Sequence, residues 1–264
     1  MSNGYLVFTP DMHYRIGHPG QSVVNTIVSA AECLSRRPYV DARHMGIQGH
    51  SRGGWETNYI LTHTHLFAAA MSSSGFCDYV ALYNGARLLR SGISRQTTYE
   101  KVYQRIGTTL WDRPDLYIEN SPIFQAAKVT TPVLMMANKV DNDVPFEEGV
   151  QLFTALRRLG KRAWMLQYDG QSHLVTSERA MTDLETRMKQ FFDVYLKDSA
   201  CPRWMLYGIP AKDKGVEDGL QLVYEKDART GRWVKPAEGG LLTEEEKKRA
   251  ESLEHRRATT VTIQ

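Results

Sequence analysis

The stretch GHSRGG at residues 49–54 decides the fold, because of what lies on either side of it. The apolar run Met45–Gln48 comes directly before it, and a helical pattern begins at Trp55. A serine on the sharp turn between a strand and a helix projects its hydroxyl beyond the end of the sheet, and glycines on both sides permit the close packing. The stretch therefore predicts Ser51 as a nucleophile. A glycine-rich helix start that binds phosphate is the alternative, although the G-x-G-x-x-G spacing of a dinucleotide loop is absent.

Short apolar runs alternate with helical patterns over the first 200 residues, which is typical of a parallel sheet covered by helices on both faces. We therefore predict an α/β fold with a mostly parallel, doubly wound sheet. The predicted strands are Tyr5–Phe8, Met45–Gln48, Phe67–Ser72, Val133–Ala137 and Trp164–Tyr168. The predicted helices are Ser22–Leu34, Trp55–Thr62, Phe146–Leu159 and Thr182–Leu196.

The composition excludes several classes of protein. Of the 264 residues, 42% are hydrophobic and 24% are charged, which excludes wholesale disorder and allows a sizeable core. The formal net charge of +3 is too small to indicate nucleic-acid binding. No apolar run approaches the ~18 residues of a membrane span, and no apolar signal segment follows Met1. Cys33, Cys77 and Cys201 lack a disulfide or metal-ligand pattern, so we expect them to be buried apolar side chains.

The last quarter of the chain differs from the rest. Residues 201–264 contain 12 Lys or Arg and 11 Asp or Glu, and proline and glycine interrupt the first half of this segment. A capping box formed by Thr243 and Glu246 predicts an exposed helix over Glu244–Arg257. We therefore divide the chain into a main part, residues 1–200, and a charged C-terminal extension with one helix.

Residues 75–130 interrupt the alternation of strands and helices with a helix-rich stretch that contains several tyrosines. An insertion of this size in an α/β sheet usually lies over the carboxyl ends of the strands, where ligands bind. We expect its aromatic side chains to pack in the core and in a lid, and a role in lining a substrate pocket is the alternative.

A nucleophilic serine needs a base and a carboxylate from elsewhere in the chain, and on this fold they follow in the order serine, acid, histidine. After residue 65 the sequence contains two histidines, of which His255 lies in the charged C-terminal helix. His173 follows the last predicted strand by a short loop and is therefore the predicted base. Asp141 and Asp143 follow the preceding strand, and spacing alone leaves either of them as the acid.

These features resemble the carboxyl-terminal catalytic domain of the prolyl oligopeptidase family of serine peptidases, including dipeptidyl and acylaminoacyl peptidases and most closely a bacterial branch. The resemblance covers about residues 4–197. It rests on GYLVFTPD at 4–11, VD at 40–41, GIQGHS at 46–51, SP at 121–122, TPVL at 131–134, DNDVP at 141–145, ALRRLGK at 155–161 and His173, with Trp204 and GIPA at 208–211 in the tail.

The resemblance implies an α/β-hydrolase domain that hydrolyses peptide bonds of short peptides through an acyl-enzyme. It implies Ser51 as the nucleophile, His173 as base and then acid, and Asp141 as the group that orients His173. It also implies that the backbone N–H of Arg52 is one oxyanion donor. No cofactor and no metal are implied.

Two positions depart from the family pattern near the expected substrate pocket, which the resemblance places at Arg52, Asp143 and Val144. Family members commonly have a tyrosine where Arg52 stands, so a preference for proline is not expected, and a guanidinium favours an acidic or polar side chain. Some dipeptidyl peptidases have an asparagine where Asp143 stands, and a carboxylate cannot donate the hydrogen bond that this asparagine makes.

The resemblance also implies absent parts. Tyr5–Phe8 corresponds to the fourth strand of the family's sheet, so the first three strands, the loop that supplies a second oxyanion donor and a preceding β-propeller are missing. We therefore expect this chain to be a fragment whose partner is the N-terminal segment of an intact parent, for which the resemblance favours the bacterial periplasm or cell envelope. The oligomeric state stays open.

Two other functions remain compatible with the sequence. An esterase on the same fold uses the same chemistry, so the triad alone does not exclude it. A non-catalytic binding module is compatible with the missing front half, although all three triad candidates are present.

Overall fold

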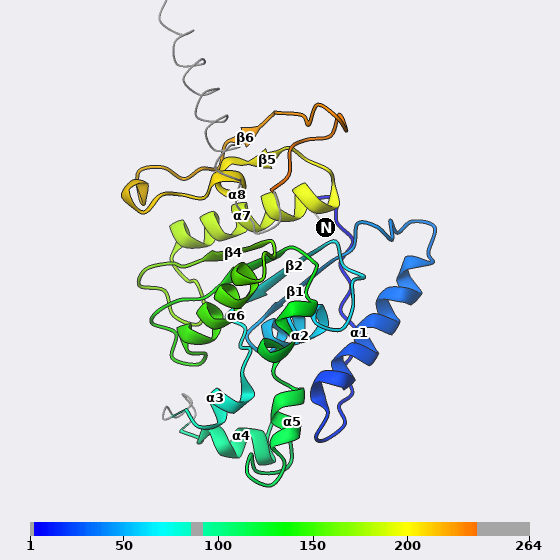
Figure 1. Cartoon of the computed structure of the whole chain (residues 1–264), viewed down its shortest axis with the longest axis vertical. Coiled ribbons are helices and arrows are strands. Elements are labelled where there is room, and N and C mark those ends of the chain that lie inside the picture. Colours follow the sequence, from blue (N-terminus) through cyan, green and yellow to red (C-terminus); the bar gives the residue numbers. More distant parts are fainter. Residues whose placement is uncertain (1–2, 86–91, 237–264) are drawn as a thin grey trace, which may run out of the picture.

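The computed structural model describes residues 3–85 and 92–236, which form a four-stranded sheet between two layers of helices (Figure 1). The strands are β1 (Gly46–His50), β2 (Ala69–Ser73), β3 (Val133–Met136) and β4 (Ala163–Leu166). They lie side by side in chain order, and each adjacent pair is parallel. The predicted α/β class is confirmed, and each of these strands overlaps a predicted one.

Each face of the sheet packs against its own helices, because successive side chains of a strand point to opposite faces. Met71 of β2 belongs to a buried cluster with α7 (Glu178–Leu196), whereas its neighbour Ala70 belongs to a cluster with α6 (Phe146–Arg158). Figure 1 shows α7 on one face and α6 with α2 (Arg52–Leu61) on the other. The sheet is therefore covered on both faces, as predicted.

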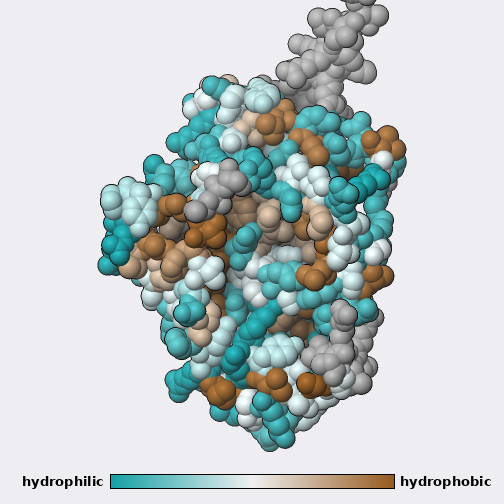
Figure 2. Space-filling model, turned by 180° about the vertical axis from the view of Figure 1, so that it is seen from behind, coloured by the Kyte–Doolittle hydropathy of each residue, from teal (hydrophilic) through white to brown (hydrophobic). Residues whose placement is uncertain are grey.

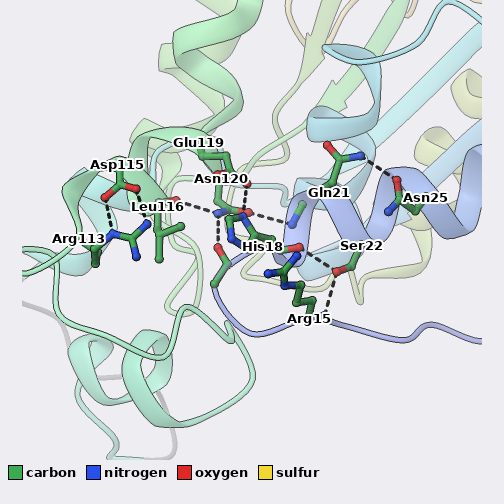
Figure 3. A network of polar contacts seen from close by, with 12 residues as sticks. Arg15, His18, Gln21, Ser22, Asn25, Arg113, Asp115, Leu116, Glu119 and Asn120 are labelled. Atoms are coloured by element: carbon green, nitrogen blue, oxygen red, sulfur yellow. Dashed lines mark hydrogen bonds and ion pairs between the residues drawn. The ribbon is translucent and has the colours of Figure 1, made fainter.

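The helix α1 (Pro19–Ser35) lies against α2 at very close range. A Cβ atom at Gly20 would lie 2.4 Å from the ring of Tyr59, so only glycine fits here. The buried side chain of Asn120 fixes the start of α1, because its Oδ1 accepts the N–H of Gly20 and its Nδ2 donates to the carbonyl of Gly17 (Figure 3). The start of α1 is thereby joined to residues 75–130.

The insertion over residues 75–130 contains α3 (Tyr79–Tyr83), α4 (Arg95–Lys101), α5 (Pro114–Glu119) and the 3-10 helix η1 (Pro122–Lys128). Its core is aromatic, with Tyr79, Tyr99 and Tyr117 fully buried in ring-to-ring contact. It also contacts residues that directly follow the sheet, since Arg95 donates to the carbonyl of Asp143 at 2.6 Å. The insertion therefore lies beside the carboxyl ends of β1 and β3, as expected.

One predicted strand is wrong. Residues Tyr5–Phe8 form no strand and are not part of a sheet, and Leu6, Val7 and Phe8 are 57–70% exposed. The physical reason is that, within the described residues, no strand lies beside them to accept their backbone hydrogen bonds. Tyr5 is held by side-chain contacts instead, because its hydroxyl donates to Asp193 of α7 at 2.6 Å.

The described residues after position 200 form β5 (Cys201–Pro202), α8 (Arg203–Tyr207), the 3-10 helix η2 (Ala211–Asp213) and β6 (Leu222–Val223), which pairs with β5. Trp204, Met205 and Leu206 are buried in the same cluster as α7. The first residues of the predicted extension therefore add to the main core. The predicted capping box and helix over Glu244–Arg257 lie outside the described residues.

Two smaller expectations concern the cysteines and the membrane. Cys77 and Cys201 are buried as expected, but Cys33 is exposed, because it lies on the outer side of α1. All three thiols are free. In the described part of the chain, no helix combines the length and the hydropathy needed to cross a bilayer.

Candidate active site

Ser51 lies on the turn between β1 and α2 in a strained conformation, with φ of 57° and ψ of −116°. Non-glycine residues rarely adopt a positive φ, and such strain is concentrated at functional sites. The turn is held by a hydrogen bond from the Ser51 N–H to the carbonyl of Ser73, at 2.8 Å.

Two glycines permit this turn. A Cβ atom at Gly49 would lie 2.0 Å from the carbonyl oxygen of Gly53, and one at Gly54 would lie 2.6 Å from the Cα atom of Gly75. A Cβ atom at Gly53, by contrast, would meet nothing within 4 Å. Gly49 and Gly54 are therefore the two glycines of the motif that the close backbone packing of the turn requires.

His173 and Asp141 form a pair at the ends of β4 and β3. Nδ1 of His173 lies 2.8 Å from Oδ2 of Asp141, whose side chain is 2% exposed. The other carboxylate oxygen accepts the backbone N–H groups of Asp143 and Val144, both at 2.8 Å. Burial alone raises the pKa of Asp141, but the hydrogen bonds from His173 and from the two backbone groups lower it below its ordinary value. Asp141 is therefore held as a carboxylate facing His173.

The two loops that carry this pair are joined by Asn138, which the sequence reasoning missed. Its fully buried side chain donates to the carbonyl of Ser172 and accepts the N–H of Tyr168. Ser74, at the end of β2, donates to the carbonyl of His173 at 3.2 Å. A polar residue directly after the apolar run of β3 was the available signal for Asn138.

Of the two carboxylates that spacing left open, Asp141 is the one that contacts His173 through a hydrogen bond. Asp143 contributes its backbone N–H to Asp141 and its carbonyl to Arg95. The oxygen and nitrogen atoms of Asp141, Asp143 and His173 lie within 4.8 Å of one another, a spacing that a metal ion could use. Both oxygens of Asp141 already accept hydrogen bonds, however, which fits an acid–base pair better than a metal centre.

The serine side of the site is less complete than the histidine side. Among residues 3–85 and 92–236, the Ser51 hydroxyl has no hydrogen-bond partner, so the structure does not join it to His173. The ring of His50 lies between the two regions, 4.8 Å from the ring of His173, and its Nδ1 is 3.0 Å from the hydroxyl of Ser73. Burial, together with the positive charge of His173, lowers the pKa of His50.

Arg52 begins α2, so its backbone N–H belongs to the first helical turn, in which N–H groups have no partner within the helix. Its side chain turns toward the insertion, where Nη1 donates to the carbonyl of Tyr103 at 2.6 Å and to the side chain of Gln104 at 2.8 Å. Val144 of the predicted pocket is buried, and Asp143 is half-buried.

A doubly covered parallel sheet with a serine on a strained strand–helix turn is the architecture of an α/β-hydrolase domain. The chain matches the prolyl oligopeptidase family over residues 13–199, and it belongs to that family.

Relatives of this chain include peptidases from bacteria and plants. The uncharacterized peptidase YuxL of Bacillus subtilis is 27% identical over 154 residues, which make up 58% of this chain and 22% of YuxL. The probable chloroplastic glutamyl endopeptidase of Arabidopsis thaliana is 26% identical over 156 residues, 58% of this chain and 14% of that protein. The chain thus spans less than a quarter of the length of these relatives.

Solved structures show the same fold. A puromycin-hydrolyzing peptidase of Mycobacterium tuberculosis superposes with a TM-score of 0.61 at 24% identity, and the superposition covers 69% of this chain and 26% of that one. The similarity agrees with the α/β-hydrolase architecture.

Proposed function

We propose that this chain carries the catalytic triad of a serine peptidase that cleaves short peptides through an acyl-enzyme, with Ser51 as nucleophile, His173 as base and Asp141 as the acid. The observation that carries the proposal is the His173–Asp141 pair beside the strained elbow of Ser51. Family membership supports it, whereas the names of the relatives refer to different substrates and leave the preferred residue open.

In the proposed reaction Ser51 Oγ attacks the peptide carbonyl as His173 takes the hydroxyl proton. Asp141 stabilises the imidazolium that forms, and the N–H of Arg52 donates to the oxyanion. His173 then gives the proton to the leaving amine, and water, activated by His173, releases the acyl group from Ser51. Each proton removed from a nucleophile is thus delivered to a leaving group.

We further propose that the site is completed by another segment of a longer parent protein, which lies against the free edge of β1. Gly46, Gln48 and His50 of β1 are exposed, whereas β2 and β3 are almost entirely buried. Figure 2 shows hydrophobic residues around a hollow on one face of the molecule, and Leu6 to Phe8 are among the exposed apolar side chains. Such a segment would cover apolar surface and supply the second oxyanion donor.

Site-mapped labelling with a fluorophosphonate tests the nucleophile. We expect modification at Ser51 that is abolished in Ser51→Ala and strongly slowed in His173→Gln. Ser35→Ala, a partly exposed serine at the end of α1, is the matched control and should react like the parent chain. Modification of another serine, or none at Ser51, would contradict the proposal.

Two further measurements separate the alternatives. Hydrolysis of aminoacyl-naphthylamides indicates a peptidase, because the amine leaving group must be protonated, whereas hydrolysis of nitrophenyl esters alone indicates an esterase. A lost oxyanion donor costs about 10²–10³ in rate. We therefore expect slow labelling of the 264-residue chain, and fast labelling of a monomer that unfolds cooperatively would argue against the requirement for another segment.

A further inference from the structure

Arg52, which directly follows the proposed nucleophile, shares the surroundings of Tyr103 with two other arginines, and we call Arg52, Arg95 and Arg105 the arginine cluster. Arg52 and Arg105 both donate to the carbonyl of Tyr103, at 2.6 and 2.7 Å. Both guanidinium groups also lie over the ring of Tyr14, at 4.9 and 4.2 Å from its centre. Two like charges therefore share the same acceptor and the same ring, an arrangement that calls for a counter-charge.

Arg95 brings a third guanidinium to this region, and it is 94% buried by the insertion, with 6% of its surface exposed. Its Nη2 donates to the carbonyl of Asp143, and its Nε has no hydrogen-bond partner within the part of the chain that the structure describes. Burial raises the pKa of Tyr103, while Arg95 and Arg52 both lower it, so this phenol lies within electrostatic reach of both arginines. The cluster thus extends from the residue after Ser51 to the loop that carries Asp143.

The carboxylates around the cluster do not balance its charge. Glu56 lies 3.2 Å from Nε of Arg52 and also accepts the hydroxyl of Tyr14, and Asp143 lies near Tyr103. A third carboxyl group, Glu148, acts on Tyr99 together with Arg95, but burial raises its pKa to about 7 and so disfavours its charge. Among the described residues, the three guanidinium groups therefore face two carboxylates that are readily ionised. In addition, Nη2 of Arg52 and Nε of Arg95 are buried without a hydrogen bond to any of the described residues. Buried cationic donors without partners are rare in native proteins and indicate a group that the described residues do not supply.

We infer that the arginine cluster binds the side-chain carboxylate of an acidic residue, aspartate or glutamate, on the amino side of the scissile peptide bond. The inference rests on the proposed function, because Arg52 directly follows the proposed nucleophile in the chain. Tyr103, whose carbonyl accepts from Arg52 and Arg105, is 41% exposed, so the cluster lies next to the surface from which a substrate side chain would enter. A bound carboxylate neutralises the surplus charge and accepts N–H groups that otherwise have no partner.

Product binding to the inactive variant Ser51→Ala tests the inference without the need for turnover. The probes are three N-acetylated tripeptides that differ in their last residue, which is Glu, Gln or Leu, and binding is measured by calorimetry at pH 7.5. The three share a terminal carboxylate, so the comparison isolates the side chain. A charged hydrogen-bond partner predicts that the Glu peptide binds at least about tenfold more tightly than the Gln peptide.

Variants of the cluster remove this preference. Arg52→Gln and Arg95→Gln, each in the Ser51→Ala background, should reduce the Glu-to-Gln ratio to about threefold or less. Arg158→Gln, an exposed arginine on α6, is the control and should retain the ratio. Thermal unfolding of each variant shows whether the variant is folded. The ratio of the Glu-peptide affinity to the Gln-peptide affinity is measured on one sample, so partial unfolding does not change this ratio.

Equal affinity for the Glu and Gln peptides, tighter binding of the Leu peptide, or no binding of any of the three overturns the inference. The labelling of Ser51 tests the proposed function independently of these binding measurements. Labelling of Ser51 without a preference for Glu rejects the acid site alone, whereas a preference for Glu without labelling rejects Ser51 as the nucleophile.

Discussion

The two halves of the candidate site are built to different degrees. On the base side, Asp141 is buried and accepts three hydrogen bonds, one of them from His173; Asp141 follows the inner strand β3, and His173 follows the edge strand β4. On the nucleophile side, Ser51 follows the edge strand β1, and its hydroxyl has no partner within the described residues. The comparison teaches that the described residues fix the His173–Asp141 pair through several hydrogen bonds, whereas they give the Ser51 hydroxyl no partner; under the proposal above, the segment that lies against β1 completes the serine side.

The largest expected effect concerns the acid on the base side. Asp141→Asn should slow fluorophosphonate labelling of Ser51 by about 10³–10⁴, because an amide cannot hold His173 in the required tautomer or stabilise its positive charge. Asp143→Asn is the matched control, since Asp143 reaches the pair through its backbone N–H, which the substitution retains. A loss below tenfold in Asp141→Asn, or an equal loss in Asp143→Asn, would show that the base side is assigned wrongly.

On the nucleophile side, we expect the stability of the protein to be most sensitive to a substitution of Gly49. Gly49→Ala should destabilise the protein by about 3 kcal/mol or more, because the new methyl group would lie 2.0 Å from a backbone oxygen that cannot move independently. Gly53→Ala, four residues further on, has free space and lies in α2, so it should be neutral or stabilising by up to about 1 kcal/mol. Urea denaturation measures both. Similar free energies of unfolding for the two variants would mean that the elbow is not packed as described.

The sequence predicted the parts of the fold that depend on local pattern. Four strands and the helices between them follow from apolar periodicity, and the strand–turn–helix context located Ser51. The rule that loops at the carboxyl ends of parallel strands carry functional residues predicted His173 and left Asp141 or Asp143 as the acid, and the family resemblance then favoured Asp141. These features involve residues close together in the chain, or strands whose order the fold class restricts.

The features that sequence reasoning missed depend on contacts between distant segments. Tyr5–Phe8 has the apolar pattern of a strand, but a strand also needs a neighbour, and periodicity does not report one. The residues next to Asn138 and Arg95 in the sequence form no motif that predicts a role. Their roles come from contacts with distant segments, since Asn138 bonds to the loop of His173 and Arg95 bonds to the loop of Asp143. The surplus of positive charge in the arginine cluster likewise could not be predicted from the sequence, because it arises only when separate segments of the chain fold together.

Glu148 connects the base side to the insertion, and its pH dependence provides the next test. This carboxyl group of α6 is 3% exposed and accepts the backbone N–H groups of Cys77 and Asp78. Burial, only partly offset by these two hydrogen bonds, raises its pKa to about 7. The folded protein therefore holds the proton more tightly than the unfolded chain does.

Because the pKa of Glu148 is higher in the folded state, its favourable contribution is complete below the ordinary value of about 4.5 and is lost as the pH rises through about 7. The free energy of unfolding, relative to that of Glu148→Gln, should therefore fall by on the order of 3 kcal/mol between pH 4.5 and 8. Glu147→Gln, an exposed residue of the same helical turn, is the control. A relative stability that rises with pH would mean that the two hydrogen bonds outweigh burial.

The smallest expected effect is the electrostatic coupling between the two halves, which His50 reports. Burial lowers the pKa of His50, the positive charge of His173 lowers it further, and the negative charge of Asp141 raises it. In proton NMR titrations, His173→Gln should therefore raise the midpoint of His50 by a few tenths of a unit, and Asp141→Asn should lower it by a similar amount. Asp169→Asn, an exposed carboxylate on the loop before His173, should leave the midpoint unchanged. Shifts of the same sign in the first two variants would indicate a structural rearrangement in place of charge, and the contact between the two rings would then not couple the nucleophile side to the base side.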